Sequence, residues 1–252
     1  MRAVPQGASA ARHRELHRRA GAHDGARSRR RAPRAPHLTH RPTRRRCVGA
    51  LLAGGAARRF QGMPKGLALV DGVRIADRAL AALRGATERQ LVVANDARAA
   101  RWFPDLAIVA DAREGLGPLV GLRTALAAAK GDPVLVVAWD MPFVTTALLA
   151  LLRTEGERGA PAVLPGAGLP PVPEPLCAWY APEALAACDR LLAAGESRAA
   201  ALHESLLGAR VLGEDALAAL GAPPRLLSSV DTLADLAALG GRLPDGEDTA
   251  RR

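Results

Sequence analysis

A glycine-rich loop that carries three cations stands out early in the chain, in the segment LLAGGAARRFQGMPKG over residues 51–66. Glycines that follow an apolar run let the backbone approach a ligand and turn its N–H groups toward an anion. Arg58, Arg59 and Lys65 add positive charge to the same loop. The loop is not a Walker-type motif, because Gly66 rather than a hydroxyl residue follows Lys65, and it is not GxGxxG. This combination favours binding of a polyphosphate, with an ordinary surface loop of an arginine-rich protein as the alternative.

Two carboxylates follow apolar runs further along the chain. Asp140 comes after the run VLVVAW, and Met141-Pro142 then forces a turn, while Asp111 comes after Ala107–Ala110. A carboxylate at the carboxyl end of a strand is well placed to hold Mg²⁺. Asp140 could instead cap the helix that begins near Thr145, and Asp111 taken singly could be an ordinary loop residue. The residues alone leave both alternatives open.

The elements that must position these groups follow from the alternation of short apolar runs with longer amphipathic ones. The predicted strands are Cys47–Leu52, Gln90–Ala94, Ala107–Ala110 and Val134–Ala138. The predicted helices are Ile75–Leu83, Ala97–Phe103, 118–130 and Thr145–Thr154. Such a β-α-β-α order predicts an α/β fold, with a mainly parallel sheet and helices on both faces. Ligands of such sheets bind at the carboxyl ends of the strands, where the glycine loop, Asn95, Asp111 and Asp140 all fall.

The second half of the chain has weaker patterns. The proline-rich segment 165–175, PGAGLPPVPEP, is predicted to be a loop with no strand or helix of its own. Cys177–Tyr180 is predicted to be an edge strand, and Val211-Leu212 a minor one. Further helices are expected near Glu183–Ala194, Ala199–Leu206 and Leu233–Leu239. We expect three parts in all: a basic N-terminal extension, 1–46, a single domain, 47–240, and a flexible tail, 241–252.

The charge of the chain is unevenly distributed. The net charge is +10, but residues 1–46 alone carry 14 Arg and only two acids, a net of +12, which leaves −2 for the rest. This extension has no apolar run with which to offset its ordering entropy, so we expect it to be disordered. The near-neutral remainder makes nucleic acid an improbable partner for the domain itself. The chain contains only two lysines, Lys65 and Lys130, which makes a lysine inside the glycine loop more informative.

Other function classes are disfavoured by simple patterns. No apolar run approaches the length of a membrane span, so no membrane partner is expected. The three cysteines are widely separated, without CxxC spacing, and predict neither a zinc site nor a disulfide framework. We therefore expect reduced thiols and a cytoplasmic location.

Five segments, in order, resemble the molybdenum cofactor guanylyltransferases, which belong to the nucleotidyltransferase superfamily with a Rossmann-like fold. They are Leu52-Ala53-Gly54-Gly55 with Arg59 and Lys65; Asp111 with Gly117-Pro118-Leu119 and Gly121; WDMPF at 139–143; Gly195-Glu196-Ser197-Arg198; and 231–236, DTLADL. The form LAGG, rather than LAAG, favours guanine over cytosine. The chain departs from the family pattern at Trp139, where Cys is usual, and at Asp231, where Asn is usual. Leu233 also replaces Pro, and Glu174 stands where His or Gln is common.

The resemblance implies a three-layer α/β/α Rossmann-like nucleotidyltransferase fold and a set of roles. Nucleotide binding would fall to Leu52, Ala53, Gly54, Gly55, Arg59, Lys65, Asn95 and Asp111. Arg59, Lys65 and Asp140 would be catalytic, with Asp140 as the first Mg²⁺ ligand and Asp111 as a supporting one. The acceptor would be bound by Gly117, Pro118, Leu119, Pro175 and Arg198.

The implied reaction transfers GMP from GTP to molybdopterin and releases pyrophosphate. Its partners would be GTP, the molybdopterin cofactor and, after the reaction, molybdoenzymes or their chaperones. Three alternatives remain open on the sequence. One is a cytidylyl- or sugar-nucleotidyltransferase of the same fold, a second is a non-catalytic nucleotide-binding regulator, and a third is a nucleic-acid-binding protein that acts through residues 1–46.

Overall fold

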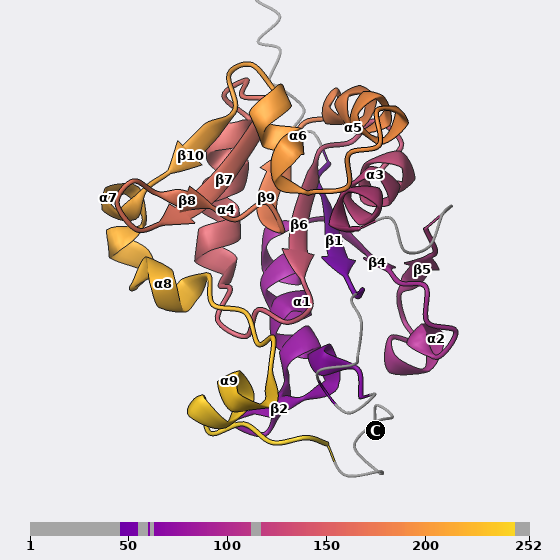
Figure 1. Cartoon of the computed structure of the whole chain (residues 1–252), viewed down its shortest axis with the longest axis vertical. Coiled ribbons are helices and arrows are strands. Elements are labelled where there is room, and N and C mark those ends of the chain that lie inside the picture. Colours follow the sequence, from indigo (N-terminus) through magenta and orange to yellow (C-terminus); the bar gives the residue numbers. More distant parts are fainter. Residues whose placement is uncertain (1–45, 55–59, 61–62, 112–116, 245–252) are drawn as a thin grey trace, which may run out of the picture. The chain divides into compact units, whose positions relative to one another are not determined.

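The computed structural model of this chain describes residues 46–54, 60, 63–111 and 117–244. These residues belong to one compact unit that spans 44–252 (Figure 1). The expected extension, apart from Arg46, and positions 245–252 of the expected tail lie outside the described residues. The division of the chain into an extension, a domain and a tail stays a prediction.

A mixed sheet forms the centre of this unit. Its strands, together with a separate hairpin, are β1 (Val48–Leu52), β2 (Leu69–Val70), β3 (Val73–Arg74), β4 (Arg89–Val93), β5 (Ala107–Val109), β6 (Val134–Ala138), β7 (Ala162–Ala167), β8 (Val172–Pro173), β9 (Cys177–Tyr180) and β10 (Arg210–Leu212). The strand order is β10-β7-β9-β6-β1-β4-β5, with β8 paired to β7, and β2 and β3 pair only with each other. β1, β4, β5 and β6 run parallel, as expected from their apolar runs.

Two expectations for the second half of the chain are wrong. Cys177–Tyr180 is not an edge strand, because β9 lies inside the sheet and pairs antiparallel with both β6 and β7. All four of its residues are buried, which a short apolar run such as CAWY allows but does not dictate. Residues 165–175 are not free of regular structure either. They include the end of β7 and the whole of β8, which pair antiparallel as a hairpin. The hairpin depends on backbone pairing, and no alternation of apolar and polar residues predicts it.

Helices cover both faces of the sheet. They are α1 (Ile75–Ala86), α2 (Ala99–Trp102), α3 (Pro118–Ala128), α4 (Thr146–Gly156), α5 (Ala184–Ala193), α6 (Ala200–Ser205), α7 (Glu214–Leu217), α8 (Pro223–Leu226) and α9 (Leu233–Ala238), with 3-10 turns η2 (Lys65–Leu67) and η3 (Ala218–Leu220). In Figure 1, α3, α5 and α6 lie in front of the sheet, and α1 and α4 lie behind it. The expected three-layer α/β/α architecture is therefore confirmed.

Two apolar cores explain this layering. Alternate residues of β1 point to opposite faces, as the period of a strand requires. Leu51 packs with α1 and α4 in one core, whereas Ala50 and Leu52 pack with α3 and α5 in the other. On α1, the predicted apolar stripe is buried, and Gly49 of β1 lets this helix lie close. A Cβ at Gly49 would be only 2.7 Å from Thr87 Oγ1.

The C-terminal segment docks onto the residues that follow the glycine loop. Leu69 and Arg242 exchange two backbone hydrogen bonds, of 2.8 and 2.9 Å. Val230 and Leu236 share a third apolar cluster with Phe60 and Ile75. Arg242, which lies in the expected tail, is therefore hydrogen-bonded to the domain.

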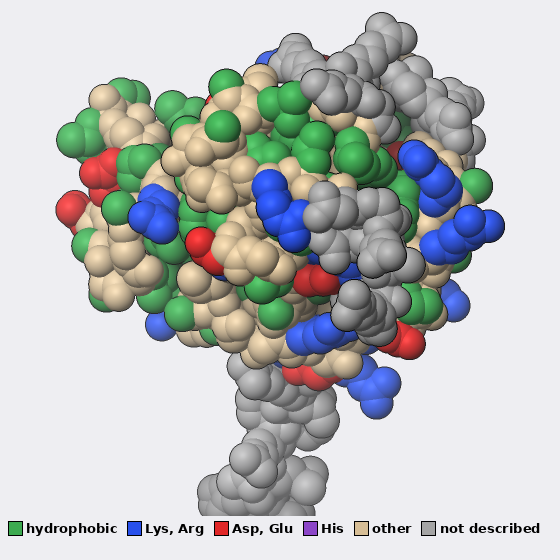
Figure 2. All heavy atoms as spheres, turned by 90° about the horizontal axis from the view of Figure 1, so that it is seen from below, with side chains coloured by type: hydrophobic (Ala, Val, Ile, Leu, Met, Phe, Trp, Pro, Cys, Tyr) green, Lys and Arg blue, Asp and Glu red, His purple; other side chains and the backbone are tan. Residues whose placement is uncertain are grey.

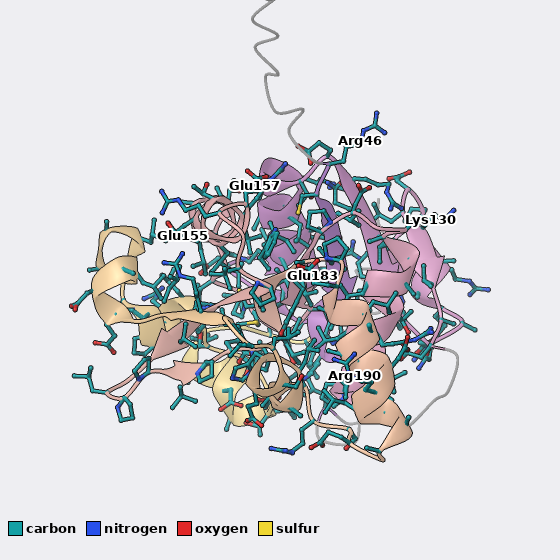
Figure 3. The ribbon with its side chains drawn as sticks, turned by 90° about the horizontal axis from the view of Figure 1, so that it is seen from above. Arg46, Lys130, Glu155, Glu157, Glu183 and Arg190 are labelled. Atoms are coloured by element: carbon teal, nitrogen blue, oxygen red, sulfur yellow. The ribbon has the colours of Figure 1, made fainter. Side chains whose placement is uncertain are left out.

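Ion pairs join α4 to neighbouring segments at the end of the molecule seen in Figure 3, where Glu155 and Glu157 are labelled. Arg153, only 3% exposed, donates to Glu88 and to Glu157, and Glu88 in turn accepts from the backbone N–H of Cys47. This network ties α4 to the start of β1, and it is structural. Among the described residues, no helix has the length and apolarity needed to cross a membrane.

Candidate active site

A cleft of about 680 Å³ lies at the carboxyl ends of the parallel strands. It forms where the chain changes direction, since β1 lies between β4 and β6 and the connections from these strands diverge. Figure 2 looks onto this end of the molecule, where acidic and basic side chains lie near one another. The lining residues are Leu52, Ala53, Gly54, Pro64, Lys65, Val93, Ala94, Asn95, Asp96, Arg98, Asp111, Gly117, Pro118, Gly121, Ala138, Trp139, Asp140 and Leu176.

Lys65 sits between two carboxylates at this cleft. Its ammonium forms an ion pair with Asp140 Oδ2 and a 2.9 Å hydrogen bond with Asp231 Oδ1. The Asp140 side chain is 9% exposed and that of Lys65 is 20% exposed, whereas Asp231 is 54% exposed. Asp140 does not cap α4, because the cap of that helix is Thr145, whose side chain accepts from Leu148 N at 3.2 Å. The alternative role for Asp140 is thereby removed.

The electrostatics of this cluster favour a charged lysine. Burial lowers the pKa of Lys65, but the two facing carboxylates raise it by more, so its pKa lies above the ordinary value. Burial raises the pKa of Glu174, and the charges of Asp140 and Asp231 add to this effect. Three acids and one lysine are therefore close enough in this part of the molecule to influence one another's ionisation.

Asp111 belongs to a second polar network on the opposite wall of the cleft. Its Oδ1 accepts a 2.6 Å hydrogen bond from Thr124 of α3, and its Oδ2 accepts a 3.2 Å bond from Asn95 Nδ2. Asn95 Oδ1 accepts in return from the backbone N–H of Asp111, at 2.7 Å. These bonds fix the ends of β4 and β5 relative to each other. They leave Asp111 as a well-positioned acceptor group at the rim of the cleft rather than as an isolated loop residue.

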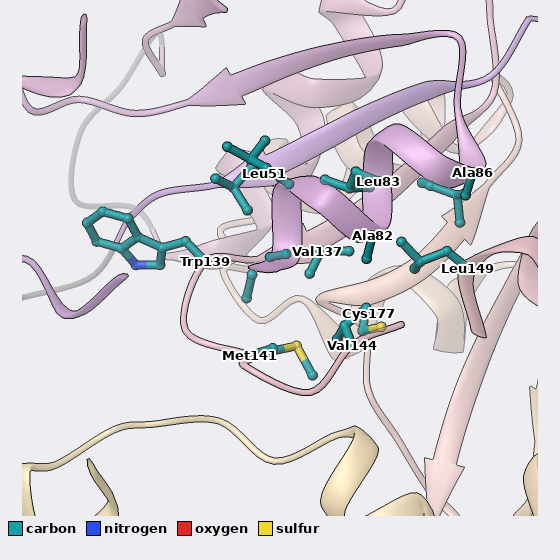
Figure 4. Close-up of a cluster of buried hydrophobic side chains, with 14 of the residues drawn as sticks. Leu51, Ala82, Leu83, Ala86, Val137, Trp139, Met141, Val144, Leu149 and Cys177 are labelled. Carbon is teal, nitrogen blue, oxygen red and sulfur yellow. The ribbon is translucent and has the colours of Figure 1, made fainter. Parts of the chain in front are cut away.

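Trp139 connects the two loops that carry Lys65 and Asp140. Its ring lies against Gly66, where a Cβ would come within 2.5 Å of two ring atoms. The ring centroid is 6.0 Å from that of Trp102 of α2. Figure 4 shows Trp139 at the edge of the buried cluster that also contains Leu51, Val137 and Met141. The glycine after Lys65 is therefore required by the tryptophan before Asp140.

Two further segments lie at the cleft, both from the expected acceptor side. Gly117 has φ 80°, in the left-handed region that favours glycine, and a Cβ there would approach Ser197 O to 2.7 Å. The segment that precedes β9 is fixed by Tyr180, whose hydroxyl donates to Pro175 O at 2.9 Å, and by Leu176 O, which accepts from Ala138 N. The start of α3 and the 174–176 segment are thus rigidly positioned.

The structure brings most of the predicted site residues together. Leu52, Ala53, Gly54, Lys65, Asn95, Asp111, Gly117, Pro118 and Asp140 all line the cleft. Gly55, Arg58 and Arg59 lie outside the described residues, so their predicted roles are not described by the structure. Pro175 and Arg198 do not line the cleft, and Arg198, 64% exposed, pairs with Glu196 at 2.7 Å. Their roles stay predictions.

Leu119 does not line the cleft, and its predicted role at the acceptor stays a prediction. Its side chain is fully buried and packs in the core between α3 and the sheet. The first turn of α3 directs this side chain inward, whereas Pro118 and Gly121 line the cleft. The backbone N–H of Leu119 donates to Ser197 O at 3.2 Å.

Sequence reasoning missed two residues that contact the predicted site residues: Thr124, which donates to Asp111, and Asp231, which pairs with Lys65. Thr124 could have been singled out as a hydroxyl on the otherwise apolar face of a predicted helix. In the sequence, Asp231 stands out only because the family pattern has Asn at this position. No spacing could place it beside Lys65, because 166 positions separate them and only the docking of the C-terminal segment joins them.

A Rossmann-like sheet with a lysine and carboxylates at its switch point is an arrangement that suits a nucleotidyltransferase. The pattern of the MobA-like NTP transferase domain matches residues 49–211, and the chain belongs to that family.

The chain is similar to a probable molybdenum cofactor guanylyltransferase of Haloferax mediterranei. The two are 33% identical over 204 residues, which cover 77% of this chain and 93% of that protein. Among solved structures, it is similar to the molybdopterin-guanine dinucleotide biosynthesis protein A of Archaeoglobus fulgidus. That likeness has a TM-score of 0.65 and 26% identity, and covers 76% of this chain and 96% of the other. A Mycobacterium tuberculosis protein in complex with manganese shares the fold, with a TM-score of 0.51 and 20% identity over 67% of this chain and 88% of its own.

Proposed function

We propose that this protein transfers GMP from GTP to the molybdopterin cofactor and releases pyrophosphate, as a step of molybdopterin guanine dinucleotide biosynthesis. The observation that carries the proposal is the meeting of Lys65 and Asp140 in a cleft at the sheet's switch point. The names of the relatives supply the nucleotide and the acceptor. The reaction would take place in the cytoplasm, with molybdoenzymes or their chaperones as recipients of the product.

The proposed chemistry needs little acid–base catalysis. A phosphate monoester has a second pKa near 6, so the acceptor is already a nucleophilic dianion at neutral pH. The main obstacle is the approach of two anions, which repel by roughly 4 kcal/mol for unit charges about 4 Å apart at an effective dielectric constant near 20. Fixed cations and precise positioning therefore supply most of the rate enhancement.

The residues of the cleft fit a divalent cation. The buried carboxylate of Asp140 already faces a cation, the ammonium of Lys65, and so occupies an environment suited to positive charge. Mg²⁺ in nucleotide enzymes is held by one or two carboxylates together with substrate phosphates. Asp140 would be its first ligand, with Asp111 as a supporting carboxylate. When bound, Mg²⁺ would neutralise charge on the triphosphate.

The remaining roles follow from where the residues lie. The backbone of Leu52–Gly54, with Gly55, would receive guanine and ribose, and Asn95 would contact the base. Lys65, with Arg59, would hold the phosphates and stabilise the pyrophosphate that leaves. Gly117 and Pro118 would border the acceptor, with Pro175 and Arg198 further out.

Pyrophosphate release from each of the four NTPs tests the proposal, with Mg²⁺ and with or without molybdopterin. We expect release only with molybdopterin, and fastest with GTP. Preference for CTP would favour a cytidylyltransferase, and GTP binding without any release would favour a non-catalytic regulator. Pyrophosphate release that is unaffected by deletion of residues 1–46 would show that the activity does not depend on a nucleic-acid-binding role of the extension.

Asp140→Asn tests the metal carboxylate within this scheme. We expect it to abolish turnover while the fold survives, because an amide is a much poorer ligand for Mg²⁺ than a carboxylate. Asp132→Asn is the matched control, since Asp132 stands just before β6 and Asp140 just after it. Full turnover of the Asp140→Asn protein would refute the assignment.

A further inference from the structure

The Lys65 ammonium pairs with two carboxylates at the cleft, and these two carboxylates differ in burial. Lys65 pairs with Asp140, whose side chain is 9% exposed, and with Asp231, whose side chain is 54% exposed. The three groups together carry one net negative charge. A divalent cation that binds Asp140 would compete with the Lys65 ammonium, because the ammonium already pairs with Asp140 Oδ2 and the two cations repel each other.

We propose that Asp231 is a positioning residue that retains the Lys65 ammonium when a divalent cation takes Asp140. The inference rests on the proposed function in one respect, namely that Asp140 holds the metal. The ammonium is already 2.9 Å from Asp231 Oδ1, so it need not leave the cleft when it gives up Asp140. Lys65 then stays at the cleft, where the phosphates arrive, instead of extending into solvent.

The position of Asp231 is fixed independently of Lys65. Ser229 Oγ donates to Asp231 Oδ2 at 2.9 Å, and the backbone N–H of Asp231 donates to Asp235 Oδ2 at 3.1 Å. Asp235 also completes the capping box of α9 with Thr232. The carboxylate is therefore presented by a rigid helix start rather than by a loose chain end.

The same segment is joined to both of the other groups. The backbone N–H of Val230 donates to Asp140 O at 2.9 Å, which links Asp231 to the loop of the metal carboxylate. The pairing of Leu69 with Arg242 links it to the segment that follows Lys65. These contacts keep Asp231, Lys65 and Asp140 in a constant arrangement, as a transfer of the lysine between two carboxylates requires.

A simpler explanation makes Asp231 only a source of negative potential that attracts the metal. The two explanations differ in a protein without Lys65. If Asp231 acts by retaining the lysine, its removal weakens metal binding only while Lys65 is present. If Asp231 attracts or ligates the metal directly, its removal weakens binding whether or not Lys65 is there.

Calorimetric titration of the full chain with Mn²⁺, without nucleotide, measures this difference. We expect Asp231→Ala to weaken Mn²⁺ binding up to about fivefold, the equivalent of an exposed ion pair. Lys65→Ala should strengthen binding by about tenfold, because the buried carboxylate loses its competing cation. Adding Asp231→Ala to Lys65→Ala should change the affinity by less than about twofold.

Equal weakening by Asp231→Ala in both backgrounds would overturn the proposal. Asp231→Asn serves if the alanine variant folds poorly, because its amide oxygen still accepts a hydrogen bond without the charge, and it should have a smaller effect. Asp189→Ala is the matched control: Asp189 is 52% exposed and pairs with Arg123 at 2.9 Å, but does not line the cleft. It should leave Mn²⁺ binding unchanged.

An Asp140→Asn titration separates this inference from the proposed function. We expect that variant to lose Mn²⁺ binding. If the variant binds Mn²⁺ as the native protein does, Asp140 is not the metal ligand. The proposal that Asp231 retains Lys65 is then refuted as well. If Asp140 binds the metal but Asp231→Ala weakens Mn²⁺ binding equally with and without Lys65, only the proposal that Asp231 retains the lysine is refuted.

Discussion

Gly66→Ala tests whether the loop that carries Lys65 and the loop that carries Asp140 are coupled through Trp139. A Cβ at position 66 would lie 2.5 Å from Cδ2 and Cε3 of the Trp139 ring, about an ångström closer than ordinary van der Waals contact allows. These are atoms of a ring body rather than the end of a flexible chain, and the ring is buried among other core side chains. The strain cannot be relieved by a simple rotamer change.

The expected cost is that of overpacking. Such insertions destabilise by about 1–3 kcal/mol, and we expect the upper part of this range because the ring is confined by Trp102. For a domain of this size, each kcal/mol lowers Tm by about 2–4 °C, so the drop should be about 4–12 °C. We also expect KM for GTP to rise, because Lys65 is the neighbouring residue.

Thermal unfolding of four proteins provides the assay: native, Gly66→Ala, Trp139→Leu and the double variant. Without the ring, position 66 should tolerate alanine at little cost. Gly54→Ala is the control in the same loop, since a Cβ there meets nothing within 4 Å, and its Tm should not change. If Gly66→Ala costs as much in the Trp139→Leu background as in the native one, the steric coupling is refuted.

Two other substitutions test the polar groups around the cleft. Thr124→Val removes the 2.6 Å hydrogen bond to Asp111 at constant volume and should destabilise by about 1–3 kcal/mol in urea unfolding, while raising KM for GTP. Thr124→Ser should restore both values, and an unchanged Thr124→Val protein would contradict the role of this bond. Glu174→Gln should gain stability relative to the native chain as pH rises from about 4 to 7. Burial raises the pKa of Glu174, with Asp140 and Asp231 adding to it, so the folded native protein binds the proton more tightly than the unfolded one and loses stability as the group ionises. A stability difference between the two proteins that does not vary with pH would contradict this.

Local patterns were sufficient for the first half of the fold. The apolar runs of β1, β4, β5 and β6 and the amphipathic stripe of α1 depend only on neighbouring residues, and the structure confirms these elements within a few residues of their predicted bounds. Residues that directly follow parallel strands, such as Asn95 and Asp140, were predictable for the same reason. Parallel strands bring their carboxyl ends to one edge, whatever the details of packing.

The second half of the fold could not be predicted in the same way. Cys177–Tyr180 has the same short apolar character whether it lies at an edge or inside the sheet, and its antiparallel pairing with β6 and β7 is a long-range choice. The pairing of Gly166 with Pro173 makes a hairpin of a proline-rich segment that carries no strand period. Burial of Leu119 was likewise decided by the direction in which α3 packs.

The sequence by itself determined that a cationic glycine loop and two carboxylates would meet at one edge of an α/β sheet. It also separated the charge of residues 1–46 from the near-neutral remainder. Only the tertiary structure decided which groups touch, because contact between distant positions depends on how whole elements dock. It placed Trp139 against Gly66, Thr124 on Asp111, and Asp231 on the Lys65 ammonium beside Asp140.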